Sequence, residues 1–129
     1  MKRKILVVDD DKEICDILTE ILAEGGYQTF SALSGRLALD TVKKKKPELV
    51  LLDIKMPKMD GIEVLKRIKK IDKEVVVVMI TGYGSLGTAK EAMRLGAYDY
   101  VTKPFDLDSI KVVIRDALSE RKPKRDVKR

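Results

Sequence analysis

Acidic residues come directly after two of the most apolar segments of the sequence. Residues 9–11 are all aspartate and follow the apolar run at residues 5–8, and Asp53 follows the apolar run at residues 49–52. Carboxylates held within a few ångströms of one another repel, and either a raised carboxyl pKa or a hard divalent cation such as Mg²⁺ relieves the repulsion. If the two segments lie side by side, the pattern therefore predicts a divalent-metal site.

A hydroxyl and an ammonium group follow two further apolar segments. Thr81 comes directly after residues 75–80, and Lys103 follows residues 97–102. A lysine binds a phosphate oxygen as a point-charge donor, and a threonine hydroxyl can donate to a second oxygen. Combined with the carboxylates and a metal, these groups suit a phosphoryl site in which a carboxylate is the nucleophile and an aspartyl phosphate forms.

The elements that must position these residues alternate along the chain. Strands are predicted at residues 5–8, 27–32, 49–52, 75–80 and 97–102, and helices at about 14–22, 35–46, 60–71, 85–95 and 110–118. Such an alternation predicts one α/β domain with a parallel sheet and helices on both faces. The carboxyl ends of parallel strands share one edge of the sheet, which is where open α/β sheets bind their ligands.

The first helix has an apolar pattern at helical spacing and a choice of caps. Asp10 and Glu13 have the spacing of a capping box, although Asp11 is the aspartate that we expect to cap the helix. Cys15 lies beside the predicted inward stripe and is expected to be an inert packing residue. The inward stripe consists of Ile14, Ile17, Leu18, Ile21 and Leu22.

Composition excludes several classes of protein. The chain has 129 residues, no histidine and one cysteine, so catalytic Ser-His or Cys-His pairs, histidine metal clusters and disulfide frameworks are ruled out. No apolar run reaches the ~20 residues of a membrane span, and a cytoplasmic location is the default expectation.

The net charge of +6 belongs to the ends of the chain. Residues 2–4 are all basic and residues 120–129 hold six basic and two acidic residues, whereas residues 5–119 have a net charge of −1. We therefore expect one folded domain at residues 1–119 followed by a disordered basic tail or linker stub at 120–129. Residues 43–46 are all lysine and are predicted to be a solvated helix end, favourable near the helix C-terminus.

Several motifs occur in order along the chain. They are Val-Val-Asp-Asp-Asp at 7–11, Leu-Leu-Asp-Ile-Lys-Met-Pro-Lys-Met-Asp-Gly at 51–61, Ile-Thr-Gly at 80–82 and Tyr-Val-Thr-Lys-Pro-Phe at 100–105. Together they resemble the receiver domain of two-component response regulators (the CheY-like family), and the similarity extends from about residue 4 to residue 118. The resemblance implies a flavodoxin-like, doubly wound (βα)5 fold with strand order 2-1-3-4-5. It also implies a phospho-accepting signalling switch that catalyses only its own phosphorylation and dephosphorylation.

The resemblance further implies roles for individual residues around the acidic cluster. Asp53 would accept the phosphoryl group from a kinase phosphohistidine. Asp9, Asp10, the Asp53 carboxylate and the backbone carbonyl of Lys55 would hold Mg²⁺ or another divalent cation. Lys55 and Tyr83 occupy the positions that modulate the lifetime of the aspartyl phosphate.

The remaining implied roles concern the phosphate and the switch. Thr81 and Lys103 would bind the phosphate, and Thr81 and Tyr100 would rearrange on phosphorylation. Pro104 would follow a cis peptide bond, which costs little before proline.

The same resemblance implies the partners. These are a sensor histidine kinase or a phosphotransfer protein, and a downstream effector or an output domain beyond this chain. Residues 79–84 and 96–100 are similar to receivers of nitrogen-regulation activators. Residues 24–30 and 53–55 are similar to the single-domain intermediate of the sporulation phosphorelay.

Three alternatives use features of the same sequence. The chain could be a receiver-like binding module that is never phosphorylated, although Asp53, Thr81 and Lys103 argue against this. It could bind nucleic acid through its basic tail. Residues 82–87 also form a literal Gly-x-Gly-x-x-Gly, but only one β-α unit follows, too little for a dinucleotide-binding domain.

Composition also predicts heat resistance. Charged residues make up 37% of the chain, asparagine is absent and Gln28 is the only glutamine, a pattern found in proteins of hyperthermophiles. Calorimetry of the purified protein should therefore give a high melting temperature. A melting temperature of about 50 °C, within the range of mesophilic domains, would contradict this prediction.

Overall fold

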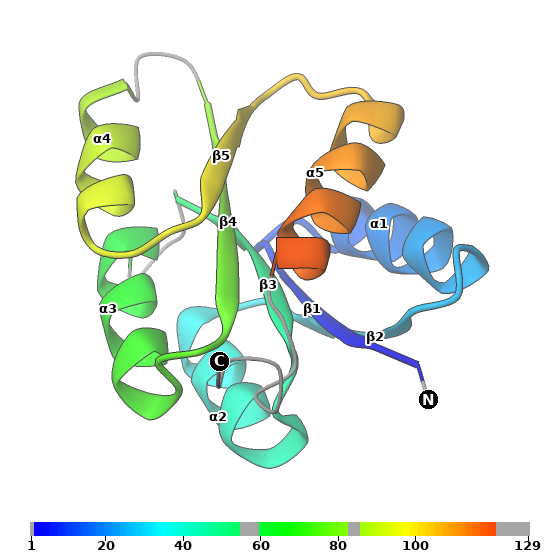
Figure 1. The fold of residues 1–129 in the computed structure, drawn as a ribbon, viewed down its shortest axis with the longest axis horizontal. Coiled ribbons are helices and arrows are strands. Elements are labelled where there is room, and N and C mark those ends of the chain that lie inside the picture. The colour runs from blue at the N-terminus through cyan, green and yellow to red at the C-terminus, as the bar shows by residue number, and fades with distance from the viewer. Residues whose placement is uncertain (1, 55–59, 83–85, 121–129) are drawn as a thin grey trace.

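Strands and helices alternate strictly along the chain. The structure, a computed structural model, describes residues 2–54, 60–82 and 86–120, and the side chains of Thr81, Leu86 and Glu120 lie outside that description. The elements are β1 (Lys4–Val8), α1 (Lys12–Glu24), β2 (Gln28–Ala32), α2 (Gly35–Lys45), β3 (Leu49–Asp53), α3 (Gly61–Ile71), β4 (Val76–Thr81), α4 (Leu86–Arg94), β5 (Asp99–Thr102) and α5 (Leu107–Glu120) (Figure 1).

The strands form one parallel sheet in the order β2-β1-β3-β4-β5. Helices α1 and α5 cover one face, and α2, α3 and α4 cover the other (Figure 1). Residues of β1 and β3 alternate between the two resulting cores, and their apolar side chains are fully buried. This explains why these strands are continuously apolar rather than alternating, and it confirms the predicted doubly wound α/β fold and strand order.

The boundaries of most elements lie within two residues of the predicted ones. Helix α5 is the main exception, because it begins at Leu107 rather than near Ile110. The Asp106 carboxylate accepts a hydrogen bond from the Ser109 backbone N–H at 3.0 Å, which lowers the pKa of Asp106 and stabilises an earlier helix start. Helix α5 also continues to Glu120, the first residue assigned to the tail, whereas residues 121–129 lie outside the described residues.

The buried face of α1 differs from the prediction. Its buried residues are Cys15, Leu18 and Leu22, whereas Ile17 is 50% exposed. The Cys15 thiol lies 3.4 Å from the Asp9 carbonyl oxygen and points at the end of β1. Because Cys15 is small, its face of α1 can lie close to the sheet. Ile17, two residues further along the helix, then points away from the sheet. Burial is the main reason why the pKa of the Cys15 thiol rises from 9.0 to about 11, as expected for an inert packing residue.

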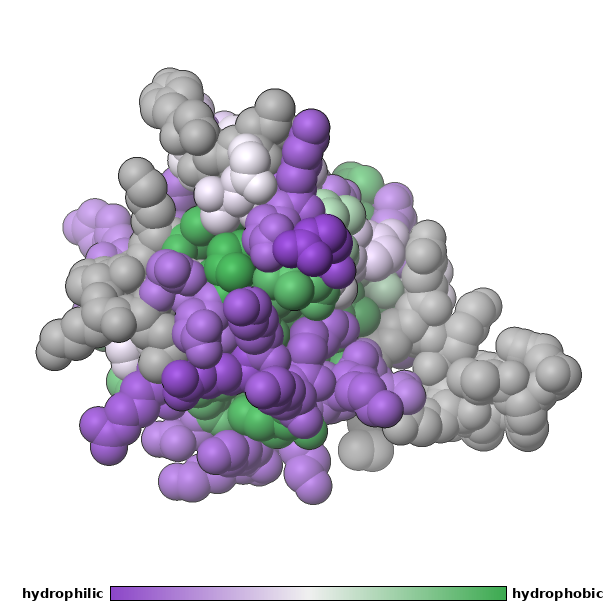
Figure 2. Space-filling view, turned by 90° about the vertical axis from the view of Figure 1, so that its left-hand side faces the viewer, coloured by the Kyte–Doolittle hydropathy of each residue, from purple (hydrophilic) through white to green (hydrophobic). Residues whose placement is uncertain are grey.

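The surface is as heavily charged as the composition requires. Hydrophilic side chains cover most of the face on the α3 and α4 side, with smaller apolar patches between them (Figure 2). Exposed ion pairs join Lys12 to Asp16 at 2.8 Å and Arg67 to Glu63 at 2.9 Å, in both cases one helical turn apart, and pairs of this kind contribute little to stability. Among the described helices, none has both the length and the hydrophobicity of a membrane span.

Helix α3 offers a test of the packing. Leu65 is fully buried against the sheet, whereas Ile71 at the end of the same helix is 38% exposed. We expect Leu65→Ala to lower the free energy of unfolding by about 2–5 kcal/mol, because it leaves a cavity, and Ile71→Ala by about 1 kcal/mol or less. Urea unfolding followed by circular dichroism measures both, and equal losses would contradict the assigned burial.

Candidate functional site

Three carboxylates meet at the carboxyl edge of the sheet. Asp9 comes directly after β1 and is 1% exposed, and Asp53 is the last residue of β3 and is 5% exposed. Strands β1 and β3 are neighbours, so the two side chains emerge side by side. Together with the exposed Asp10, they place carboxylate oxygens within 4.8 Å of one another. The convergence predicted from the sequence is therefore found.

Hydrogen bonds fix the position of Asp9. Its backbone N–H donates to the Ala32 carbonyl at 3.2 Å, and its Oδ1 accepts from the Asp11 N–H at 2.9 Å. Asp11 turns away and caps α1, since its Oδ1 accepts from the Glu13 N–H at 2.9 Å. The prediction that Asp11 caps α1 is confirmed, and the prediction of a capping box between Asp10 and Glu13 is wrong. The cap must directly precede the first helical residue, which leaves Asp10 to the acidic cluster.

Asp53 is held by backbone contacts on both sides. In the β3–β4 register it pairs with Ile80, and the following Ile54 N–H donates to the Ile80 carbonyl at 3.0 Å. The Gly61 N–H donates to the Ile54 carbonyl at 2.6 Å. A Cβ on Gly61 would lie 2.5 Å from Ile54 Cα and 2.6 Å from the Asp53 carbonyl oxygen. The start of α3 can therefore approach the strand this closely only with glycine.

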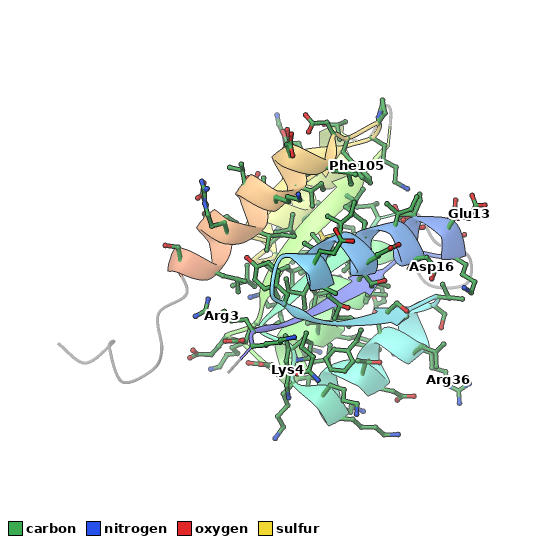
Figure 3. The ribbon with its side chains drawn as sticks, turned by 90° about the vertical axis from the view of Figure 1, so that its right-hand side faces the viewer. Arg3, Lys4, Glu13, Asp16, Arg36 and Phe105 are labelled. Carbon is green, nitrogen blue, oxygen red and sulfur yellow. The ribbon has the colours of Figure 1, made fainter. Side chains whose placement is uncertain are left out.

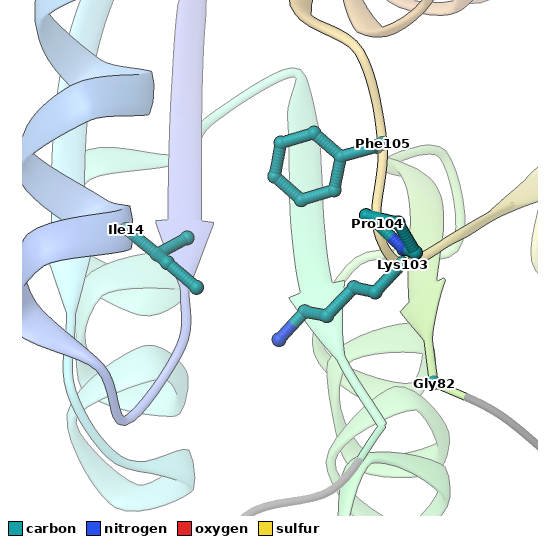
Figure 4. Close-up of a pocket in the computed structure, with 5 residues that line it drawn as sticks. All are labelled: Ile14, Gly82, Lys103, Pro104 and Phe105. Atoms are coloured by element: carbon teal, nitrogen blue, oxygen red, sulfur yellow. The ribbon is translucent and has the colours of Figure 1, made fainter.

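Lys103 supplies the positive charge of the site. Its Nζ lies 3.4 Å from Asp9 Oδ2 and 3.6 Å from Asp53 Oδ2. The Lys103–Pro104 peptide bond is cis, the conformation that the family resemblance implies for Pro104. Figure 4 shows the lysine side chain reaching from the loop after β5 across the site. It partly neutralises the two buried carboxylates, which would otherwise repel each other at full strength.

The cluster as a whole fits a divalent cation. All of its candidate ligand atoms are carboxylate oxygens, they come from three residues, and two of these are buried. The formal charge of three carboxylates exceeds that of Lys103, the cation that contacts them among the described residues, so an added cation would reduce the remaining repulsion. Oxygen ligands in this number suit Mg²⁺, which binds through one or two carboxylates and keeps waters or phosphate oxygens as its other ligands.

A pocket of about 560 Å³ adjoins the lysine. It is lined by Ile14, Gly82, Lys103, Pro104 and Phe105, and Figure 4 shows Ile14 of α1 facing Lys103 and Phe105 of the loop after β5. Sequence reasoning did not find this pocket, because its apolar residues come from α1 and from the loop after β5, which only the tertiary fold brings together. The pocket leaves an open approach beside Lys103.

The structure describes the other predicted site residues only in part. Thr81 ends β4, one residue beyond the partner of Asp53, so its backbone lies at the same edge. Tyr100 lies on the edge strand β5 and is 37% exposed. Lys55 and Tyr83 lie outside the described residues.

Several known proteins are similar to this chain in sequence. Residues 5–115 match the family model of the response regulator receiver domain. The chain is similar to sporulation initiation phosphotransferase F of Bacillus subtilis, with 48% identity over 118 residues that cover 92% of this chain and 95% of that protein. It is 39% identical to the regulatory protein AtoC of Escherichia coli, over 97% of this chain but only 27% of AtoC.

Solved structures of known proteins also superpose on this one. NtrX of Brucella abortus superposes with a TM-score of 0.91 and 42% identity, over 98% of this chain and 29% of that chain. A CheY-like receiver domain protein of Methanospirillum hungatei superposes with a TM-score of 0.90 and 32% identity, over 94% of this chain and 97% of that chain. The chain thus spans nearly all of some similar proteins and about a quarter of others.

The contact at Gly61 generates a prediction. Gly61→Ala should lower the free energy of unfolding by about 1–3 kcal/mol, because the new methyl group forces the backbone behind Asp53 to move. Gly82→Ala is the matched control, since a Cβ there meets no atom of the described residues within 4 Å, and it should leave stability unchanged or slightly raised. Chemical unfolding of both variants tests this, and a fully stable Gly61→Ala would refute the close approach.

Proposed function

The chain belongs to the response regulator receiver family, and on that premise we propose that Asp53 accepts a phosphoryl group from a kinase phosphohistidine. Mg²⁺ or another divalent cation would be held by Asp9, Asp10 and Asp53. The observation that carries the proposal is the convergence of these carboxylates on one ammonium group, with Lys103 Nζ 3.4 Å from Asp9 and 3.6 Å from Asp53.

The proposed reaction is a displacement at phosphorus. A carboxylate oxygen of Asp53 forms the new P–O bond while the P–N bond to the imidazole of the donor breaks, and the imidazole leaves with the bonding electron pair. The donor histidine must come from the partner, because this chain has none. Transfers of this kind depend mainly on positioning and on neutralising the phosphoryl oxygens.

Lys103 and a divalent cation held by the acidic residues would both attract the charge of the transferred group. The Lys103 ammonium would bind a phosphoryl oxygen, since it already lies within 4 Å of the proposed acceptor. A bound divalent cation would neutralise further charge on the transferred group. The near-complete burial of Asp9 and Asp53 strengthens these interactions, because water screens them less.

The switch would follow from the new charge at Asp53. We propose that the Thr81 hydroxyl binds the phosphoryl group and that Tyr100, now 37% exposed, turns inward. Lys55 would contribute its backbone carbonyl to the metal, and Lys55 and Tyr83 would set the lifetime of the phosphate. The changed surface would be recognised by a downstream effector or by an output domain joined beyond residues 1–119.

The test is phosphorylation of the purified protein. Incubation with Mg²⁺ and a small phosphodonor such as acetyl phosphate should add the mass of one phosphoryl group to the intact protein, and chelation of the metal should prevent it. Asp53→Asn should remain unlabelled, because an amide is not a competent nucleophile. Asp16→Asn, which removes an exposed carboxylate of α1, should be labelled like the wild type.

Two results would count against the proposal. An unlabelled wild-type protein would favour a receiver-like binding module that is never phosphorylated. Equal labelling of Asp53→Asn and the wild type would place the acceptor elsewhere.

A further inference from the structure

A second charged cluster lies at the opposite end of the molecule from Asp53. Lys2, Arg3, Lys4, Lys46 and Glu48 line a pocket of about 310 Å³. Figure 3 shows Arg3 and Lys4 at the end where β1 begins and α5 finishes, far from Glu13 and Phe105. The pocket thus collects four cationic side chains and one carboxylate at the amino edge of the sheet.

The charged groups of two of these side chains are held by contacts with the fold. Lys4 belongs to β1, and its Nζ donates to the Lys45 carbonyl at 3.0 Å. Arg3 donates from Nη1 to the Leu118 carbonyl at 2.8 Å, and its Nε lies 3.6 Å from a carboxylate oxygen of Glu48. The charged groups of Arg3 and Lys4 are therefore positioned by Glu48 and by the ends of α2 and α5 before any ligand arrives, which reduces the entropic cost of binding.

Helix capping explains only part of this cluster. Lysines in the last turn of α2 complement the negative end of its dipole. Lys4 Nζ also binds the Lys45 carbonyl at that end of α2. Lys2 and Arg3 precede β1, and the dipole of α2 gives no reason for them to line the same pocket. Like charges gathered in this way repel, and an anion between them relieves the repulsion.

We propose that this pocket binds a compact polyphosphate anion, either free or as the phosphate chain of a nucleotide. Lysine ammonium groups bind phosphate oxygens as point charges, and several donors suit a chain of phosphates better than a single one. A compact anion fits better than a nucleic acid, because the pocket is one local hollow. The proposal is independent of phosphorylation at Asp53.

The test is calorimetric titration of the full chain with tripolyphosphate, at low ionic strength and with EDTA present to keep metals off the acidic cluster. One saturable site is expected, with affinity that falls as salt is added. Lys4→Gln combined with Lys46→Gln should weaken binding about tenfold or more, as expected when two charged donors are removed. Lys90→Gln combined with Lys111→Gln makes the same charge change on exposed parts of α4 and α5 and should stay within about twofold of the wild type.

Further titrations distinguish a nucleotide from a free polyphosphate as the ligand. ATP binding at least as tightly as tripolyphosphate would support the site and identify a nucleotide as its ligand, whereas tighter tripolyphosphate binding would support a free polyphosphate. If the double variant unfolds, Lys46→Gln alone, at an exposed position, should still weaken binding about threefold. Failure of the wild type to bind, equal losses in both double variants, or binding of duplex DNA but not of tripolyphosphate would overturn the proposal.

Discussion

Electrostatic repulsion between buried carboxylates is the constraint on which the rest of this structure depends. Asp9 and Asp53 are almost fully buried at the ends of adjacent strands, and carboxylates in such a position are costly unless a positive group faces them. Lys103, delivered by the loop after β5, is the partner that the chain itself provides. Within the described part of the chain, its single charge leaves the cluster with an excess of negative charge, which suits a divalent cation and the transfer that we propose.

The fold serves this constraint by fixing the backbone behind the acidic groups. Cys15 lets α1 lie against the end of β1 and keeps a small, protonated thiol there. Gly61 lets the start of α3 contact the backbone after Asp53. The parallel sheet places carboxylates at one edge and basic residues near the start of β1 at the other. Residues 5–119 have a net charge of −1, yet acidic and basic groups lie at opposite edges of the sheet. The acidic edge suits a cation, and we propose that the basic edge binds an anion.

The sequence predicts the alternation of strands and helices and the shared edge of the site, because both follow from the order of apolar runs, whereas the strand order was implied by the family resemblance. The carboxyl ends of parallel strands share one edge of the sheet, so Asp9, Asp53 and Lys103 could be expected at the same edge without coordinates. The rotation of α1 and the contact at Gly61 could not be predicted, since they depend on distances between elements. The basic pocket was also missed, because residues 2–4 and Lys46 belong to separate segments that each have an ordinary explanation as solvated charge.

The most direct test of the central claim is to identify the modified residue chemically. Borohydride reduces an aspartyl phosphate to homoserine, and peptide mass mapping then locates it. After incubation with Mg²⁺ and acetyl phosphate, we predict homoserine at position 53 and nowhere else, and none when the metal is chelated. Homoserine at another acidic residue, or equal conversion of Asp53 without a divalent cation, would contradict the role assigned to the three clustered carboxylates.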